Sequence, residues 1–275
     1  MSDESSHKRL EGGLRWLTQS ARARLLNNLH VKGDPLILFN IWDAGSAKAI
    51  EDIGAKVIAT GSWSVAAAHG YDDGEKLPFD FVLANLKRII ASVNLPVTID
   101  LEGGYGRSPV QVQESVAKVI ETGAVGINFE DQIIGGEGLY SIEDQCARIK
   151  AARAAAEHAS IPIFINARTD VFLKSNPAQN HDGHLEEAIR RSAAYAESGA
   201  SGFFAPGLRN AKDIEKLCEA SSIPINILVL PDAPSPKQLA NLGIARISYG
   251  PRPYRQMIDV LKEAGRKALS MSELL

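Results

Sequence analysis

Cysteine is scarce in this chain, and neither sign of charge prevails. Of 275 residues only Cys146 and Cys218 are cysteines, and they form no CxxC or other metal-binding spacing, so we expect no disulfide framework. The chain has 30 Lys and Arg against 33 Asp and Glu, a formal net charge of −3. That balance gives no electrostatic basis for binding nucleic acid or an acidic membrane, and we expect neither partner.

Long apolar runs are also missing. The N-terminal stretch MSDESSHKRLEGGLRW has no apolar segment of the kind found in signal peptides. No run approaches the ~18 apolar residues of a membrane span. The composition, 45% hydrophobic and 23% charged, is ordinary for a globular protein. We therefore expect a soluble, cytoplasmic protein.

Two kinds of marker alternate along the chain and indicate its organisation. Prolines precede four apolar runs and glycines precede four others, in the order Pro35, Gly54, Pro96, Gly123, Pro162, Gly199, Pro224 and Gly243. Proline at a strand start needs no ladder donor, and glycine after a helix suits the left-handed position that ends it. Each marker therefore predicts the end of a helix and the start of a strand.

Eight such units over ~250 residues predict an α/β fold of the (β/α)₈ TIM barrel type. We expect residues 31–275 to form this single barrel domain and residues 1–30 to be an N-terminal helical extension. A doubly wound sheet is the structural alternative, but its first strand is usually followed by a GxGxxG turn, and here WDAGSAKAI follows. Ser108, Pro109 and Gln111 predict a capping box that begins a helix running to Ile120.

Polar residues recur at alternate positions of the predicted strands. In LPVTIDLE, Thr98, Asp100 and Glu102 share one face, and apolar residues share the other. The same alternation predicts further inward-facing residues: Asn40 and Trp42; Asn128 and Glu130; Asn166, Arg168 and Asp170; and Asn226. Because barrel enzymes build their sites at the carboxyl ends of strands, we expect one mouth that gathers Asp43, Asp100, Glu102, Glu130, Asp131, Arg168 and Asp170.

So many carboxylates in one mouth require protons or a cation to neutralise them. Oxygen ligands without nearby His or Cys favour Mg²⁺ or Mn²⁺, and Mg²⁺ keeps several waters, so some acids would act through water. Simpler roles compete with this one. Asp43, Asp131 and Asp170 would also serve as helix N-caps, and Arg168 as a structural partner of an acid. The pair Asp100 and Glu102 is harder to explain without a cation.

Four stretches together resemble a known superfamily. They are NIWDAGSAKAIEDIGAKVIATGSWSVAAAHGYDDGE, LPVTIDLEGGYG, GAVGINFEDQ and FINARTDVF, in that order between Pro35 and Tyr254. The chain is similar in these stretches to the isocitrate lyase/phosphoenolpyruvate mutase superfamily. The resemblance implies a (β/α)₈ barrel, a homo-oligomer (tetramer or dimer) whose subunits exchange the C-terminal helix, and Mg²⁺ with a small 2-oxocarboxylate or its enolate. It also implies chemistry at a C–C or P–C bond next to that enolate.

The resemblance assigns roles to particular residues. It implies a metal group of Asp100, Glu102 and Glu130, with Asp73 from the loop after the second strand. It implies that Arg168 and the loop Gly61, Ser62 and Trp63 hold the substrate carboxylate, the loop through backbone N–H groups. We also place Trp42, Asp100 and Asn226 among the substrate-binding residues. The expected catalytic residues are Asp73, Glu130 and Arg168.

One loop departs from the superfamily pattern. Its lyases carry a mobile loop with a catalytic cysteine after the fourth strand, and its mutases carry Lys and Asn there. This chain reads EDQIIGGEGLYSIEDQ, which leaves only Glu137 and Tyr140 able to move a proton between Asp131 and Ser141. We expect a Mg²⁺-dependent lyase-type enzyme that acts through a metal-bound enolate, with C–C cleavage favoured. The alternatives are a phosphonopyruvate-type P–C hydrolase or mutase, and a non-catalytic protein that binds an oxoacid.

Overall fold

Eight parallel strands alternate with helices in the computed structural model, which describes residues 17–174 and 181–272. The strands are β1 Leu36–Leu38, β2 Ile58–Ala59, β3 Val97–Asp100, β4 Gly126–Glu130, β5 Phe164–Arg168, β6 Gly202–Phe204, β7 Ile225–Leu228 and β8 Arg246–Ser248. The helices are α2 Gln19–Asn28, α3 Ala44–Asp52, α4 Ser62–Ala68, α5 Phe79–Ser92, α6 Pro109–Glu121, α7 Ile142–His158, α8 Val171–Lys174, α9 His181–Glu197, α10 Ala211–Ala220, α11 Pro236–Asn241 and α12 Arg252–Ser272.

The strands form one sheet that curves into a barrel. Their order is β1-β8-β7-β6-β5-β4-β3-β2, and all pairs are parallel. A parallel bridge between Ile41 and Thr60 joins the two edges, and Ile41 N donates to Ala59 O at 2.9 Å. The predicted (β/α)₈ barrel is confirmed. Each of the eight Pro and Gly markers also lies between a helix and the next strand, as predicted.

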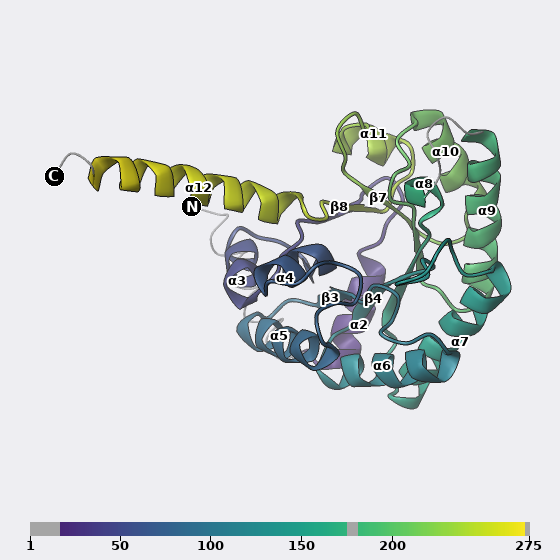
Figure 1. Cartoon of the computed structure of the whole chain (residues 1–275). Coiled ribbons are helices and arrows are strands. Elements are labelled where there is room, and N and C mark those ends of the chain that lie inside the picture. Colours follow the sequence, from purple (N-terminus) through teal and green to yellow (C-terminus); the bar gives the residue numbers. More distant parts are fainter. Residues whose placement is uncertain (1–16, 175–180, 273–275) are drawn as a thin grey trace, which may run out of the picture.

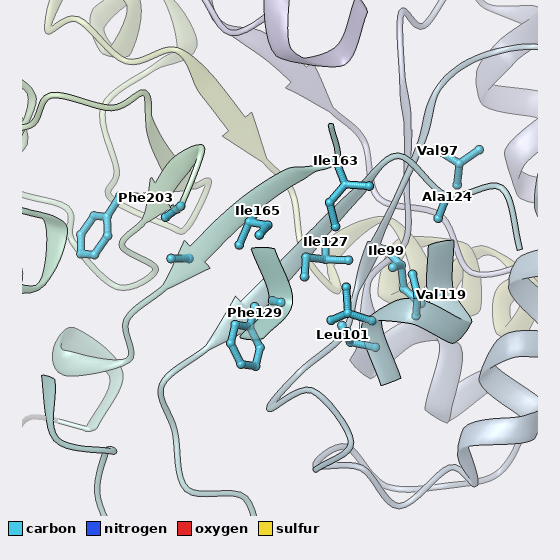
Figure 2. Close-up of a cluster of buried hydrophobic side chains, with 14 of the residues drawn as sticks. Val97, Ile99, Leu101, Val119, Ala124, Ile127, Phe129, Ile163, Ile165 and Phe203 are labelled. Carbon is cyan, nitrogen blue, oxygen red and sulfur yellow. The ribbon is translucent and has the colours of Figure 1, made fainter. Parts of the chain in front are cut away.

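The helix-facing side of the sheet carries the apolar core. Ile99 of β3 and Leu101 just after it lie on this side, as do Ile127 and Phe129 of β4, and all of them are buried. Figure 2 shows these side chains gathered on one face of the strands with Val119 of α6. The capping box predicted for α6 is present: Ser108 Oγ accepts from Gln111 N, and Pro109 is the first helical residue. Packing of α5, α6 and α7 against this face leaves the opposite, polar face inside the barrel.

Helix α2 closes the amino-terminal end of the barrel. Its Leu26 is fully buried against residues from β1, β2 and β5. A Cβ atom on Gly126 would lie 2.8 Å from Leu26 Cδ2, so glycine makes room for this helix inside the barrel. His30 stacks on the Phe164 ring with 3.8 Å between centroids. This helix lies within the predicted N-terminal extension, of which residues 1–16 are outside the described residues.

Helix α12 leaves the barrel instead of packing on it (Figure 1). The described helices leave the outer face of β1 uncovered, because Ile37 is 43% exposed and the adjacent Phe39 is 39% exposed. Val260 and Leu261 of α12 are also exposed. Within residues 17–174 and 181–272, no helix is long and apolar enough to cross a bilayer.

Candidate active site

The carboxyl ends of β3, β4 and β5 place three charged side chains at one mouth of the barrel. Asp100 ends β3, Glu130 ends β4 and Arg168 ends β5. All three lie on the inward-facing parity, in register across the sheet: Asp100 pairs with Asn128, and Glu130 pairs with Arg168. The sequence pattern therefore predicted the position of this group correctly.

Asp100 has one oxygen that the protein satisfies and one that it does not. Its Oδ2 accepts from the backbone N of Ser62 at 3.1 Å and from Ser62 Oγ at 2.9 Å. Its Oδ1 is buried and has no hydrogen-bond partner. A buried carboxylate oxygen without a donor is costly, so this atom points to a ligand that supplies positive charge.

Glu102 lies beyond the end of β3, in a turn where its φ is +52°. Its Oε2 accepts from the backbone N of Gly74 at 2.8 Å and of Glu75 at 2.7 Å, and its Oε1 accepts from Tyr105 Oη at 3.3 Å. Burial, together with the charge of Asp73, raises the pKa of Glu102 to about 7. Glu102 therefore fixes the loop that carries Asp73.

Asp73 itself is exposed at the rim of this mouth. Partial burial and the neighbouring charge of Asp100 raise the pKa of its carboxyl. The influence of Asp73 on Glu102 and of Asp100 on Asp73 shows that these three acids share one electrostatic environment. The mouth is short of positive charge.

Arg168 joins two carboxylates. Its Nη1 lies 2.7 Å from Glu130 Oε2, and its Nε and Nη2 donate to the two oxygens of Asp170 at 2.6 and 2.8 Å. Three of its five N–H groups are therefore occupied, and 18% of the side chain stays exposed for a further anion. Burial opposes the charge of Arg168, but both acids raise its pKa. Burial raises the pKa of Glu130 even though Arg168 opposes the shift.

Two of the acids expected in the mouth have structural roles instead. Asp131 faces the helices: its Oδ2 accepts from Arg191 Nη1 at 3.0 Å and from Tyr195 Oη at 2.8 Å. The prediction that it lines the mouth was wrong, because residue 131 has the opposite parity to residue 130. Asp43 is the N-cap of α3 and accepts from Ser46 N at 2.7 Å, the simpler of its two predicted roles.

Backbone N–H groups of the predicted substrate-binding loop already donate hydrogen bonds within the protein. The N–H of Gly61 donates to Ile41 O at 3.1 Å, and that of Ser62 donates to Asp100. These two amides are therefore not available to a substrate carboxylate, contrary to the expectation from sequence. Ser62 instead positions Asp100.

Three further predicted residues contact other parts of the barrel. Trp42 and Trp63 both contact the Tyr254 ring at the start of α12, with centroid distances of 5.1 and 6.0 Å. Asn226 is 1% exposed inside the barrel, where its Nδ2 donates to Ser248 Oγ at 3.2 Å. Their assignment to substrate binding stays a prediction.

Sequence reasoning did not assign Arg148, which supports the Gly103–Gly106 turn. This buried arginine donates from Nη2 to the carbonyl oxygens of Gly103 and Gly106, and its guanidinium lies 4.0 Å from the Tyr140 ring centroid. It therefore joins the turn after Glu102 to the loop after β4. An arginine in a helix, about 45 residues from the turn it supports, leaves no local signal in the sequence.

The loop after β4 is a short hairpin that packs beside the acid cluster. Gln132 and Leu139 form an antiparallel bridge, and Tyr140 N donates to Asp131 O at 2.8 Å. Ile134 packs against Gly103, where a Cβ atom would lie only 2.7 Å from Ile134 Cγ1. Glycine at 103 thus allows the hairpin to seat beside Glu102.

The donors at the mouth fit a hydrated hard cation. Among the described residues, no three His, Cys, Asp or Glu side chains form a complete ligand set. The available atoms are nevertheless carboxylate oxygens, and Asp100 Oδ1 is buried without a partner. Mg²⁺ usually binds one or two carboxylates and keeps several waters, so an incomplete protein ligand set matches its preference.

Comparisons with known proteins agree with this geometry. The family model described as phosphoenolpyruvate phosphomutase matches residues 26–269. A solved structure of a proposed phosphonomutase from Burkholderia cenocepacia J2315 is 43% identical, with a TM-score of 0.88, and covers 91% of this chain and 99% of that one. The 2-methylisocitrate lyase of Escherichia coli (strain K12) is 29% identical over 203 residues, 70% of this chain and 65% of the lyase. A phosphonopyruvate hydrolase solved with oxalate and Mg²⁺ shares the fold, at 21% identity, a TM-score of 0.81 and coverage of 93% and 88%.

A closed parallel barrel with a cluster of acids at the carboxyl ends of its strands is the arrangement of a barrel enzyme. The chain belongs to the phosphoenolpyruvate phosphomutase family. It is an enzyme of the superfamily of lyases and mutases that includes this family.

Proposed function

We propose that this protein is a Mg²⁺-dependent lyase that acts on a small 2-oxocarboxylate and cleaves a C–C bond next to an enolate. The observation that carries the proposal is the buried, unpartnered Oδ1 of Asp100 within a group of acids beside Arg168. A relative at 29% identity is a 2-methylisocitrate lyase, and a neighbour in structure was solved with oxalate and Mg²⁺. Oxalate is a planar mimic of a 2-oxoacid enolate.

Four acids would hold the ion, Mg²⁺ or Mn²⁺. Asp100 is the proposed direct ligand through Oδ1, while Glu102, Glu130 and Asp73 would bind waters of the ion. When bound, the ion supplies Lewis-acid stabilisation of negative charge on the substrate oxygen. Ser62 holds Asp100 in place through its hydroxyl and its amide.

Arg168 would bind the substrate carboxylate. Two of its N–H groups are not used by Glu130 or Asp170, and the side chain reaches the mouth. The two acids keep the guanidinium charged and fix its plane, which favours recognition of a planar carboxylate. In the cleavage step, a proton leaves the hydroxyl group of the departing fragment, which is released as a carbonyl compound. The electrons of the broken C–C bond pass to the 2-oxo group to give the enolate, and the proton then returns to the enolate carbon.

Asp73 is the proposed source of that proton. The hairpin after β4 contains no Cys, Lys or His, and its Glu137 lies at the exposed tip. Asp73 is exposed at the mouth, and partial burial raises its pKa, which favours uptake of a proton by this carboxyl.

The first test combines binding with turnover. We expect Mg²⁺ to bind in calorimetry and the Asp100→Ala variant to lose this binding, because the free Oδ1 is removed. A panel of 2-oxoacids and phosphonates with Mg²⁺ would then identify the substrate. Unchanged Mg²⁺ affinity in Asp100→Ala would show that the metal assignment is wrong.

The panel also separates two alternatives. Release of phosphate or rearrangement of a phosphonate, followed by ³¹P detection, would support P–C chemistry, which the match to a phosphomutase family favours. Binding of oxalate without turnover of any compound would support a non-catalytic oxoacid-binding protein, which the hairpin lacking Cys, Lys and His favours.

We also propose that α12 packs on a second copy of this chain. The uncovered outer face of β1, with Ile37 and Phe39, offers a site of matching apolar character for exposed α12 residues such as Leu261. The expected product is a dimer, or a tetramer of two such dimers. Light scattering should show an oligomer that Leu261→Glu converts to a monomer; a monomeric wild-type protein would contradict the proposal.

A further inference from the structure

An uncompensated positive charge lies inside the barrel, below the mouth. Arg246 is the first residue of β8 and is 1% exposed. Its Nη2 donates to Asn128 Oδ1 at 2.9 Å, while its Nε and Nη1 have no hydrogen-bond partner. No carboxylate within the described residues forms an ion pair with it. A buried guanidinium in this state costs stability, and such groups persist where they have a function.

Arg246 of β8 reaches across the barrel interior to β4, beside the acid cluster. Asn128, which accepts from Arg246, is paired with Asp100 across β3 and β4. The same Asn128 oxygen also accepts from Asn166 Nδ2 at 2.9 Å, which fixes the amide. Arg246 thus contacts the side chain of the residue that is paired with Asp100 across β3 and β4.

The electrostatics of the barrel interior agree with this position. Burial lowers the pKa of Arg246 to about 9, and Asp100 is the acid that opposes the shift. The guanidinium is therefore still charged at neutral pH. On the opposite side, burial and the charge of Arg246 lower the pKa of His30 to about 3. Arg246 accordingly lies between the α2 end of the barrel and the mouth, and its charge acts on both.

We propose that Arg246 is a positioning residue, whose buried positive charge offsets the negative charge of Asp100 from inside the barrel. This charge weakens binding of the divalent cation alone and strengthens binding of the anionic oxoacid. The inference rests on the proposed Mg²⁺ and oxoacid site. Its consequence is that the ion is held firmly only together with the oxoacid. Asp100 Oδ1 and the two free nitrogens of Arg246 are the unpartnered groups on which it stands.

The proposal predicts changes of opposite sign for a cation and an anion. A fixed positive charge below the mouth repels Mg²⁺ and attracts oxalate, and a low-dielectric interior makes both effects large. Loss of a merely structural side chain would loosen the site and weaken both ligands. The sign of the two changes therefore distinguishes an electrostatic role from a structural one.

The experiment measures Mg²⁺ affinity, and oxalate affinity at saturating Mg²⁺, by calorimetry for wild type and Arg246→Met. We expect Arg246→Met to bind Mg²⁺ about tenfold more tightly and oxalate about tenfold more weakly. Arg246→Lys should retain both wild-type affinities when all variants are compared at about pH 6, where a buried lysine with a lowered pKa still keeps most of its charge. Weaker binding of both ligands, or no change in either, in Arg246→Met would overturn the proposal.

Two further variants keep the test decisive. If Arg246→Met does not fold, Arg246→Gln takes its place, because it removes the charge and keeps a donor to Asn128. If only Arg246→Lys folds, a changed Mg²⁺ affinity in that variant overturns the proposal. Arg153→Met is the matched control, because Arg153 bonds Gly199 O and Ile163 O at the amino-terminal end of the barrel. We expect it to lower stability and to leave both affinities unchanged. Absence of Mg²⁺ and oxalate binding in the wild type would instead contradict the proposed function.

Discussion

Glu130 and Asp131 are neighbours in the chain, yet they belong to two different acid–arginine pairs. Asp131 is fully buried on the helix side, and its oxygens accept from Arg191, from Tyr195 and from the backbone N of Asp170 at 3.0 Å. Glu130 faces the barrel interior, where Arg168 is shared with Asp170 and the other neighbours are acids. The protein itself satisfies the hydrogen bonds of Asp131, whereas the surroundings of Glu130 have more negative than positive charge.

This difference separates the framework from the site. A buried acid whose oxygens all have donors holds elements together, and here Asp131 links β4 and β5 to α9. A buried acid with too few donors destabilises the protein unless a ligand completes it. We expect substitutions on the two sides to change different properties: stability at Asp131 and ligand binding at Glu130.

The largest expected effect is the loss of stability in Asp131→Ala. The substitution leaves Arg191 and Tyr195 without their buried acceptor, which should cost about 3–5 kcal/mol in the free energy of unfolding. Denaturant unfolding measures the change, and Asp131→Asn, which keeps some acceptors, should lose less. The folded fraction should bind Mg²⁺ with unchanged affinity; a loss of affinity would place Asp131 in the site after all.

The opposite result is expected for Glu130→Gln. Removal of one negative charge from the proposed metal group should weaken Mg²⁺ binding by about a hundredfold. The metal-free protein should be no less stable than wild type, because Arg168 still has Asp170 and the acids repel one another less. Calorimetry and thermal unfolding give the two quantities. A stability loss as large as that of Asp131→Ala would remove the distinction between the two pairs.

The same comparison shows how far the sequence could predict this protein. The Pro and Gly markers predicted all eight strand starts. Both preferences are local: a strand can begin with a proline that lacks an N–H donor, and a helix often ends in a glycine with left-handed backbone. Strand alternation predicted that Asp100, Glu130 and Arg168 would meet, because each lies on a regular strand up to its last residue. Where the backbone stays extended, parity is reliable.

The prediction was less accurate where the strand ends. Glu102 was placed on the same inward face as Asp100, but β3 stops at Asp100 and a positive φ turns Glu102 toward the Gly74 and Glu75 amides. The partners of Asp131 come from α9, about 60 residues away, and no strand pattern refers to them. Tertiary contacts of this kind become visible only in the folded structure.

A pH dependence should also separate the site from the framework. The pKa of Glu102 is about 7 in the folded protein against an ordinary value of 4.5, so the folded state binds the proton more tightly. Stability of the metal-free protein should therefore fall as pH rises from about 4.5 to 7, by about 1–3 kcal/mol. Mg²⁺ should reverse this trend, because it replaces the proton.

Thermal unfolding from pH 4.5 to 8, with chelator and with Mg²⁺, measures the effect. Glu102→Gln, which cannot lose a proton, should flatten the profile of the metal-free protein. A metal-free profile whose stability rises throughout this window would contradict the assignment of Glu102 as an acid with a raised pKa. Equal profiles with and without Mg²⁺ would show that the ion does not bind this group.

The smallest effect is expected at Asp43, which tests the framework side of the comparison outside the two buried pairs. Asp43 caps α3, and its Oδ1 accepts from the backbone N and the hydroxyl of Ser46, each at 2.7 Å. Asp43→Ala should cost about 1 kcal/mol of unfolding free energy, and Asp43→Asn or Asp43→Ser, which also cap helices, should lose less. Mg²⁺ affinity should stay at the wild-type value in all three variants. If Asp43→Ala instead weakened Mg²⁺ binding, an acid whose hydrogen bonds the protein already satisfies would have to help bind the ion. Satisfied hydrogen bonds would then no longer distinguish a framework acid from an acid of the site.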